Sequence, residues 1–280
     1  MVVIDKGKCV ACGACVRDCV AHVLTTGPDG LPHMRPEDEQ FCINCQHCLA
    51  VCAQGAVTCN DVGFADTLEV ESVPDGEAEA ALLRQRRSIR QWGKGPIGED
   101  VWKRLVDTLA WMPTGCNDHQ LHFTVVRDSE LMEWFRSETS RMVKRIVRLG
   151  ILQLLYPEFR RYMDEVVRGE DVVFRNAPYM IVASTPKKAP CREADPWIAL
   201  SYFDLLARAN GLGTCWGGFA VHAFKLVRRF RRALKIPKGH EVGAVLLFGR
   251  PGVAYARVTR PSPMPVDVLI RCAGCAVDLV

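Results

Sequence analysis

Eight cysteines near the N-terminus repeat one spacing twice, and thiolates at this spacing bind iron–sulfur clusters. Both runs read C-x2-C-x2-C-x3-C: Cys9, Cys12, Cys15 and Cys19, then Cys42, Cys45, Cys48 and Cys52. Three closely spaced thiolates bind three irons of one cube, and the fourth cysteine, set off by the longer gap, binds the other cube. We therefore expect two 4Fe–4S clusters, one on Cys9, Cys12, Cys15 and Cys52, the other on Cys42, Cys45, Cys48 and Cys19.

Zinc is the main alternative, because pairs of the form C-x2-C also build zinc ribbons. A zinc ion takes four ligands and does not explain two identical runs of four cysteines. The N-terminal segment resembles bacterial two-cluster ferredoxins, although Val20 and Ala53 stand where a proline usually follows the fourth cysteine. Proline is not a ligand, so the expected ligand sets are complete. The ninth cysteine, Cys59, is interpreted as a small buried residue and not as a ligand.

Four separated segments further along offer groups that suit a nucleotide with a planar ring. Arg86, Arg87, Ser88 and Arg90 place three guanidinium groups and a hydroxyl together, which can hold a phosphate dianion by charge-assisted hydrogen bonds. Residues 113–120 form a polar loop whose amide suits the edge of a heterocycle. The glycines of residues 211–218 allow backbone to approach a planar ring closely. Arg257 and Arg260 follow the last expected core strand.

Taken in order, these segments resemble the nitroreductase family of flavoproteins over residues 81–265. The resemblance rests on Arg-Arg-Ser-Ile-Arg at 86–90, Pro-Thr-Gly-Cys-Asn at 113–117 and Gly-Leu-Gly-Thr-Cys-Trp at 211–216. It implies bound FMN and an intertwined homodimer with a flavin site at each subunit interface. The residues that it implies for FMN are Arg86, Arg87, Ser88 and Arg90 at the phosphate and ribitol, Thr114 and Asn117 in the loop that faces the ring, the backbone around Cys215, Trp216, Gly217 and Gly218, and Arg260 or Arg257 at the phosphate.

One departure from the family pattern follows Asn117. The family usually continues Gln-Pro-Trp, whereas this chain reads Asp-His-Gln-Leu over residues 118–121. We place this difference on the substrate side of the site. The family's substrates are therefore not carried over to this chain.

The elements that must position these groups alternate between helix and strand after the cysteine runs. Apolar periodicity and stop signals predict helices over 78–92, 99–112, 129–168 (one or two), 195–210 and 224–234, and strands over 123–126, 179–183 and 242–248. The expected fold class is α+β, with a ferredoxin-like two-cluster domain fused to a nitroreductase-like FMN domain. We place the two-cluster domain at 1–62, a linker at 63–80, the FMN domain at 81–270 and a C-terminal tail at 271–280, whose Cys272 and Cys275 form a lone C-x2-C pair.

Composition excludes several classes of function. The net charge of +4 over 280 residues is too small to indicate nucleic acid or a membrane surface as partner. No segment reaches the roughly 20 apolar residues that span a bilayer, and the N-terminus lacks the pattern of a signal peptide. Fourteen cysteines favour metal binding in a reducing compartment, so we expect a cytoplasmic protein.

Clusters and a flavin in one chain predict an FMN-dependent, nitroreductase-like oxidoreductase. We expect electrons to pass between the two clusters and FMN and to reduce a small acceptor such as a nitroaromatic, a quinone or a related conjugated compound. Ferredoxin or another carrier is the expected donor, and the basic residues between Lys225 and Lys238 form either its docking patch or a plain solvated surface. Two alternatives stay open: a redox relay or sensor with a protein partner, and an NAD(P)H-fed flavin reductase whose clusters are the electron exit. No side chain is assigned as a catalytic acid or base.

Overall fold

The computed structural model describes residues 1–148 and 160–268, and its N-terminal part is a small domain built around the cysteine runs. Strand β1 (Val2–Ile4) pairs antiparallel with β4 (Val57–Cys59), and β2 (Leu24–Thr26) pairs antiparallel with β3 (Pro32–Met34). The short helices α1 (Ala14–Asp18) and α2 (His47–Ala50) each carry the third cysteine of one run, and the fourth cysteine lies just after the helix. The 3-10 helix η1 (Pro36–Phe41) precedes the second run. Cys15, Cys48 and Cys59 are buried in this domain's core with Val2, Val23, Leu24, Leu49 and Val57.

An exposed segment connects this domain to the rest of the chain. After the 3-10 helix η2 (Phe64–Asp66), residues 67–75 contain no helix or strand, and α3 (Gly76–Gln85) then begins with the Asp75 carboxylate accepting from the Ala78 amide. The predicted helix over 78–92 is too long, because Arg86 is extended. The amide of Ile89 donates to the Thr214 carbonyl at 2.7 Å, and this pairing with a strand ends the helix.

A four-stranded antiparallel sheet forms the centre of the second domain. Its order is β5-β6-β8-β7, with β5 (His122–Val126), β6 (Tyr179–Pro186), β7 (Gly213–Trp216) and β8 (His240–Gly249). The three predicted strands are present, and β7 is an additional one. Both faces of the sheet are covered, one by a core that includes Phe135, Phe224 and Phe230, the other by a core that includes Trp102 and Phe203.

The helices follow the predicted order with local breaks. They are α4 (Glu99–Asp107) with η3 (Thr108–Trp111), η4 (Gly115–Asn117), α5 (Ser129–Arg148), α7 (Arg160–Arg168), α8 (Asp195–Ala209), α9 (Gly218–Leu226) and α10 (Arg228–Ala233). The single helix predicted over 224–234 is wrong, because Val227 is extended (φ −100°, ψ 104°) and separates α9 from α10. The mixed helix and sheet content confirms the α+β class.

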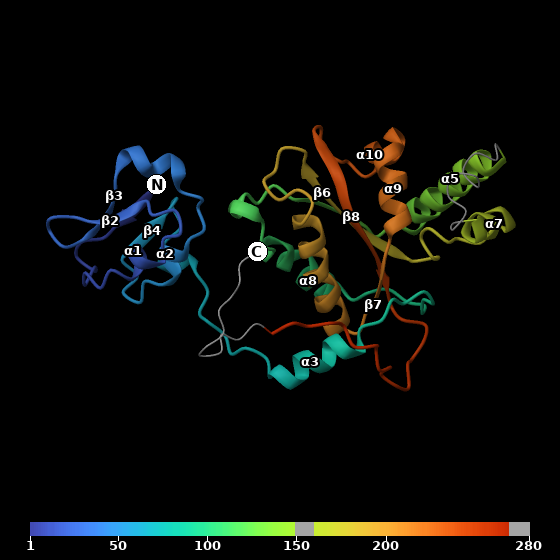
Figure 1. Cartoon of the computed structure of the whole chain (residues 1–280), viewed down its shortest axis with the longest axis horizontal. Coiled ribbons are helices and arrows are strands. Elements are labelled where there is room, and N and C mark those ends of the chain that lie inside the picture. Colours follow the sequence, from blue (N-terminus) through green and yellow to red (C-terminus); the bar gives the residue numbers. More distant parts are fainter. Residues whose placement is uncertain (149–159, 269–280) are drawn as a thin grey trace, which may run out of the picture.

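Along the long axis of the molecule, the cluster domain occupies one end (Figure 1). The sheet and α8 lie in the middle, and α5 and α7 project at the other end. No helix within residues 1–148 and 160–268 is long and apolar enough to cross a membrane. The predicted tail at 271–280, with Cys272 and Cys275, lies outside the described residues.

Candidate functional site

The cysteines of the two runs lie in mixed groups. Cys19 of the first run lines one small cavity together with Cys42, Cys45 and Cys48 of the second. In the first run, burial raises the pKa of the Cys15 thiol, and the neighbouring Cys52 and Cys9 add to this shift. Burial likewise raises the pKa of the Cys48 thiol to about 12. Cys19 therefore lies with the first three cysteines of the second run, and Cys52 lies near Cys15 of the first run. Two cubes require such an exchange of the fourth ligand.

Hydrogen bonds contact two of the cysteines in this domain. The Ala56 amide donates to Cys52 Sγ at 3.3 Å, a contact that stabilises a cluster thiolate. Over the described part of the chain, no three His, Cys, Asp or Glu side chains converge as ligands of one metal ion. Cys59 is 1% exposed and donates to Asn44 Oδ1 at 3.4 Å, and it also lines the cavity of the second run.

In the second domain, Gly213 allows the arginine segment at 86–90 to lie against β7. A Cβ at Gly213 would stand 2.6 Å from Ile89 Cγ1, so a side chain there would push the two segments apart. Ser88 forms a parallel bridge with Thr214. The predicted phosphate segment and the predicted ring-facing segment at 215–218 are therefore neighbours.

Arg86 and Arg87 of the predicted phosphate site make different contacts. Arg86 turns inward and pairs at 3.7 Å with Asp204, which is 3% exposed on α8. Burial raises the pKa of the Asp204 carboxyl, and a hydrogen bond from the Thr214 hydroxyl and the charge of Arg86 oppose that shift. Arg87 donates to the Thr259 hydroxyl, which brings the exposed segment of Arg257 and Arg260 to the same edge.

A cavity of about 650 Å³ opens beside β7. Four of the predicted flavin residues line it: Arg90, Cys215, Trp216 and Gly218. Burial raises the pKa of the Cys215 thiol, opposed by the charges of Arg90 and Arg175, so this thiol is a neutral packing group. The Trp216 ring lies 5.0 Å from the Trp197 ring of α8 at an interplanar angle of 31°. The volume lies within the range of roughly 300–1,000 Å³ that is usual for cofactor and ligand pockets.

The opposite walls of the cavity come from residues that no sequence motif marked. They are Thr139, Met142, Val143 and Ile146 of α5, Tyr162, Met163 and Val166 of α7, Phe219, His222, Ala223 and Leu226 of α9, and Val172, Val173 and Arg175 of the segment before β6. Apolar periodicity predicted the helices, but not which helix faces would meet. Arg175 has no local signal at all.

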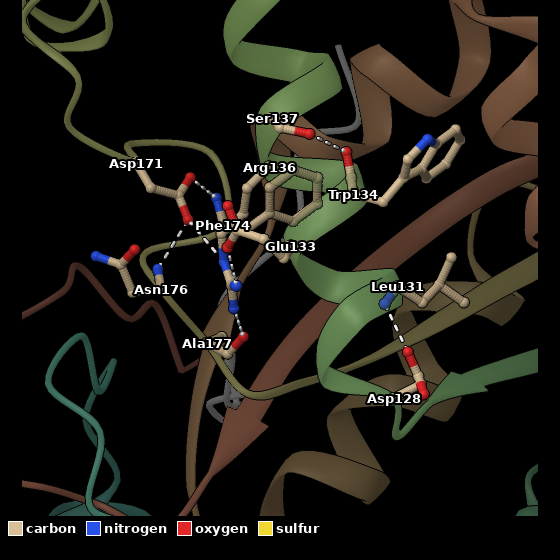
Figure 2. Close-up of polar contacts among 10 residues, drawn as sticks. All are labelled: Asp128, Leu131, Glu133, Trp134, Arg136, Ser137, Asp171, Phe174, Asn176 and Ala177. Atoms are coloured by element: carbon tan, nitrogen blue, oxygen red, sulfur yellow. Dashed lines mark hydrogen bonds and ion pairs between the residues drawn. The ribbon is translucent and has the colours of Figure 1, made fainter.

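Arg136 and Asp171 hold the segment that carries Arg175 (Figure 2). The Asp171 carboxylate accepts from the amides of Phe174 and Asn176, both at 2.8 Å, and pairs with Arg136 Nε at 3.5 Å. Arg136 also donates to the Ala177 carbonyl at 2.6 Å. The Trp92 indole donates to the Arg175 carbonyl at 2.8 Å. Arg175 is therefore fixed at the cavity from two sides.

The loop at 113–120 does not line this cavity. Its Gly115 amide donates at 3.0 Å to Asp195, which is 3% exposed at the start of α8. The Thr114 hydroxyl accepts from the His119 amide at 3.0 Å, and Asn117 contacts the cluster domain. Within one chain, the predicted flavin residues therefore lie in two separate places.

Comparison with known protein families identifies the family that each domain matches. Residues 83–250, more than half of the chain, match the Nitroreductase family, and residues 8–57 match the 4Fe-4S dicluster domain. The chain belongs to the nitroreductase family. The two matches confirm the predicted family and fold class, the FMN-dependent oxidoreductase class, and an N-terminal domain for 4Fe–4S clusters.

Individual members of the nitroreductase family are only distantly similar. A nitroreductase with bound FMN from Bacteroides fragilis has 18% identity and a TM-score of 0.56, over 68% of this chain and 98% of that one. A nitroreductase with bound FMN from Desulfitobacterium hafniense has 20% identity and a TM-score of 0.55, with the same shares covered. An iodotyrosine deiodinase from Thermotoga neapolitana is 24% identical over 136 residues, 48% of this chain and 69% of the relative. At these identities the structures show a common fold.

Proposed function

We propose that this protein passes single electrons between two 4Fe–4S clusters and FMN and uses the reduced flavin to reduce a small conjugated acceptor. The observation that carries the proposal is the cavity beside β7, where Arg90 and the segment Cys215–Gly218 meet in a nitroreductase-family domain fused to a dicluster domain. FMN bound there would accept single electrons and donate an electron pair or a hydride, chemistry that the cofactor supplies and the protein positions.

Different residues of this chain would bind different parts of FMN. Ser88, Arg87 and Arg90 would bind the phosphate and ribitol, with Arg257 or Arg260 joining through the contact of Arg87 with Thr259. Arg86 would act indirectly, because its guanidinium already faces Asp204. The backbone at Trp216, Gly217 and Gly218 would lie against the ring, and Trp197 packs behind Trp216.

The cavity walls favour a planar, largely apolar acceptor. The faces of α5, α7 and α9 supply mostly aliphatic and aromatic side chains, which exclude water from the reacting ring. Arg175 adds a guanidinium that would favour an acceptor whose oxygens carry full or partial negative charge, as in a carboxylate or a nitro group. The named relatives, nitroreductases and an iodotyrosine deiodinase, support a compact aromatic acceptor.

A homodimer would complete the site. The outer face of α8 leaves Trp197, Ile198 and Tyr202 exposed at 44%, 40% and 55%, a patch suited to a second subunit. Because the loop at 113–120 is away from the cavity of its own chain, its predicted contact with FMN requires the cavity of the partner. We also place the protein in the cytoplasm, where thiols stay reduced.

Anaerobic half-reactions test this function. Protein loaded with clusters and FMN is mixed in turn with reduced ferredoxin, NADH and NADPH, while cluster and flavin absorbance are followed separately. A nitroaromatic, a quinone and a halogenated phenol are then added to the reduced protein. Reoxidation of the flavin with stoichiometric product supports the proposal. Reduced flavin that none of the acceptors reoxidises, together with a protein partner retained only in one redox state, would instead favour a relay or sensor.

A further inference from the structure

The two domains meet through the side chain of Asn117. Its Nδ2 donates to the carbonyl oxygens of Ile43 at 3.0 Å and Asn44 at 3.1 Å. These two residues lie between Cys42 and Cys45 in the second cysteine run. Only the NH2 end of an amide can satisfy two carbonyls, and His119 Nε2 bonds the other end, Oδ1, at 2.9 Å. Both ends of the Asn117 side-chain amide are therefore hydrogen-bonded at the domain boundary.

The backbone around Asn117 holds it in this position. Cys116 and Asn117 both have φ of 54°, and on the other side Asn44 also has φ of 54°, a region that residues other than glycine rarely adopt. The loop is anchored to α8 by the bond from Gly115 to Asp195. A Cβ at Gly115 would lie 2.4 Å from Cys191 Sγ, so only glycine fits there. Both loops that form the contact thus contain residues with left-handed backbone conformation.

We propose that Asn117 docks the second cysteine run onto the flavin domain, so that the cluster on Cys42, Cys45, Cys48 and Cys19 is the inner one, which exchanges electrons with FMN in the cavity of the partner subunit. This inference rests on the proposed function. The cavity shared by these four cysteines also borders Ile43. In the first run, Val10 is 62% exposed and Cys12 is exposed, so the cluster on Cys9, Cys12, Cys15 and Cys52 is the outer one, open to a donor.

The electron balance of this path is simple. A one-electron donor would reduce the cluster held by Cys9, Cys12, Cys15 and Cys52, that cluster would reduce the inner one, and the inner cluster would pass its electron to bound FMN. Two such passages, with two protons from water, reduce one FMN. In the test below the donor is dithionite.

The first arm of the test compares Asn117→Asp with Gln120→Glu. Both variants add one negative charge to the same loop, but only the first removes the two donors to the cluster domain. We expect Asn117→Asp to slow the passage of electrons from reduced clusters to FMN roughly thirtyfold, the change that two net hydrogen bonds of docking support. Cluster reduction by dithionite and the iron content stay unchanged. Hydrogen exchange should rise at residues 43–45 and 115–118 in Asn117→Asp alone.

The second arm removes one cluster at a time. Protein with Cys12→Ser should still pass electrons rapidly from its remaining cluster to FMN, whereas Cys45→Ser should not, although its remaining cluster is reduced. The opposite order overturns the inference, as does an Asn117→Asp protein that behaves like Gln120→Glu in both rate and exchange. If Cys45→Ser loses both clusters, the comparison of Asn117→Asp with Gln120→Glu decides whether the inference holds. If FMN in the unaltered protein is reduced no faster with clusters than without them, the proposed function fails instead.

Discussion

Replacement of Asp171 by alanine tests whether the contact between Arg136 and Asp171 supports the cavity wall. The Asp171 side chain is 13% exposed and accepts two backbone amides besides pairing with Arg136. Each hydrogen bond to a charged group contributes about 1.5–3 kcal/mol, and some amides would find water in the variant. We therefore expect a loss of about 3 kcal/mol. Arg136 itself keeps the Ala177 carbonyl and the Glu133 carboxylate as partners.

Thermal unfolding of protein loaded with clusters and FMN measures this loss. For a domain of this size, 1 kcal/mol corresponds to about 2–4 °C, so the flavin-domain transition should fall by about 6–12 °C. Asp171→Asn retains one acceptor oxygen and should lose about half as much. The matched control is Glu133→Gln, because Glu133 pairs with the same arginine but is 69% exposed, and exposed pairs contribute only about 0–1 kcal/mol. The reasoning is refuted if Asp171→Ala melts at the same temperature as the unaltered protein. It is also refuted if the melting temperature of Glu133→Gln falls as far as that of Asp171→Ala.

Three further predictions concern cofactors and assembly. The protein should hold about eight irons per chain with matching sulfide, and the Cys59→Ala variant should keep all of them. Stoichiometric zinc without sulfide, or loss of four irons in the variant, would contradict the ligand sets. Heat should release FMN and not FAD, and Arg90→Ala should weaken FMN binding roughly ten- to a hundredfold, whereas Arg84→Ala on exposed α3 should leave it unchanged. Sedimentation should show a dimer, and Tyr202→Asp on the exposed face of α8 should shift it toward monomer; a monomeric unaltered protein would remove the shared-site argument.

Much of this architecture was predictable because its signals are local. The spacing of the cysteine runs depends on cluster geometry, and the helices α4, α5 and α8 repeat apolar residues with helical period. Strand β7 escaped prediction because Gly213–Trp216 is short and its partners, Ile89 and β8, are distant in sequence. The same pairing ended α3 early. The break between α9 and α10 at Val227 was likewise not predicted, because no glycine or proline marks it in the sequence.

The site was predictable only where a motif carries it. Arg90 and the segment 215–218 were assigned to FMN by resemblance, and they line one cavity in the structure. Arg175 was missed because its place depends on contacts with Asp171 and Trp92 that no sequence window contains. Asn117 was expected to face the flavin ring, and within its own chain its amide contacts the cluster domain. Sequence resemblance transfers a residue type but not the new neighbour that a fused domain brings.

The position of the clusters also decides where a protein donor should dock. The basic residues between Lys225 and Lys238 are partly occupied, since Arg229 pairs with buried Glu138 and Arg231 donates to the His240 carbonyl. Helix α10 moreover lies apart from the cluster domain (Figure 1), so a carrier bound there would not face the clusters of the same chain. The exposed part of the first cysteine run, preceded by Lys6 and Lys8, is the better entrance.

We therefore expect Lys8→Glu to slow reduction by ferredoxin several-fold at low salt, and Arg232→Glu to leave it unchanged. Electrostatic steering acts on the association rate and weakens as the Debye length falls to about 8 Å at 0.15 M salt, so the difference should fade with added salt. Reduction by dithionite, whose small size needs no docking surface, serves as the control and should be equal in both variants. Stopped-flow traces of cluster absorbance give these rates. If Arg232→Glu is the slow variant, the donor approaches from the α10 side and the first cysteine run is not the entrance.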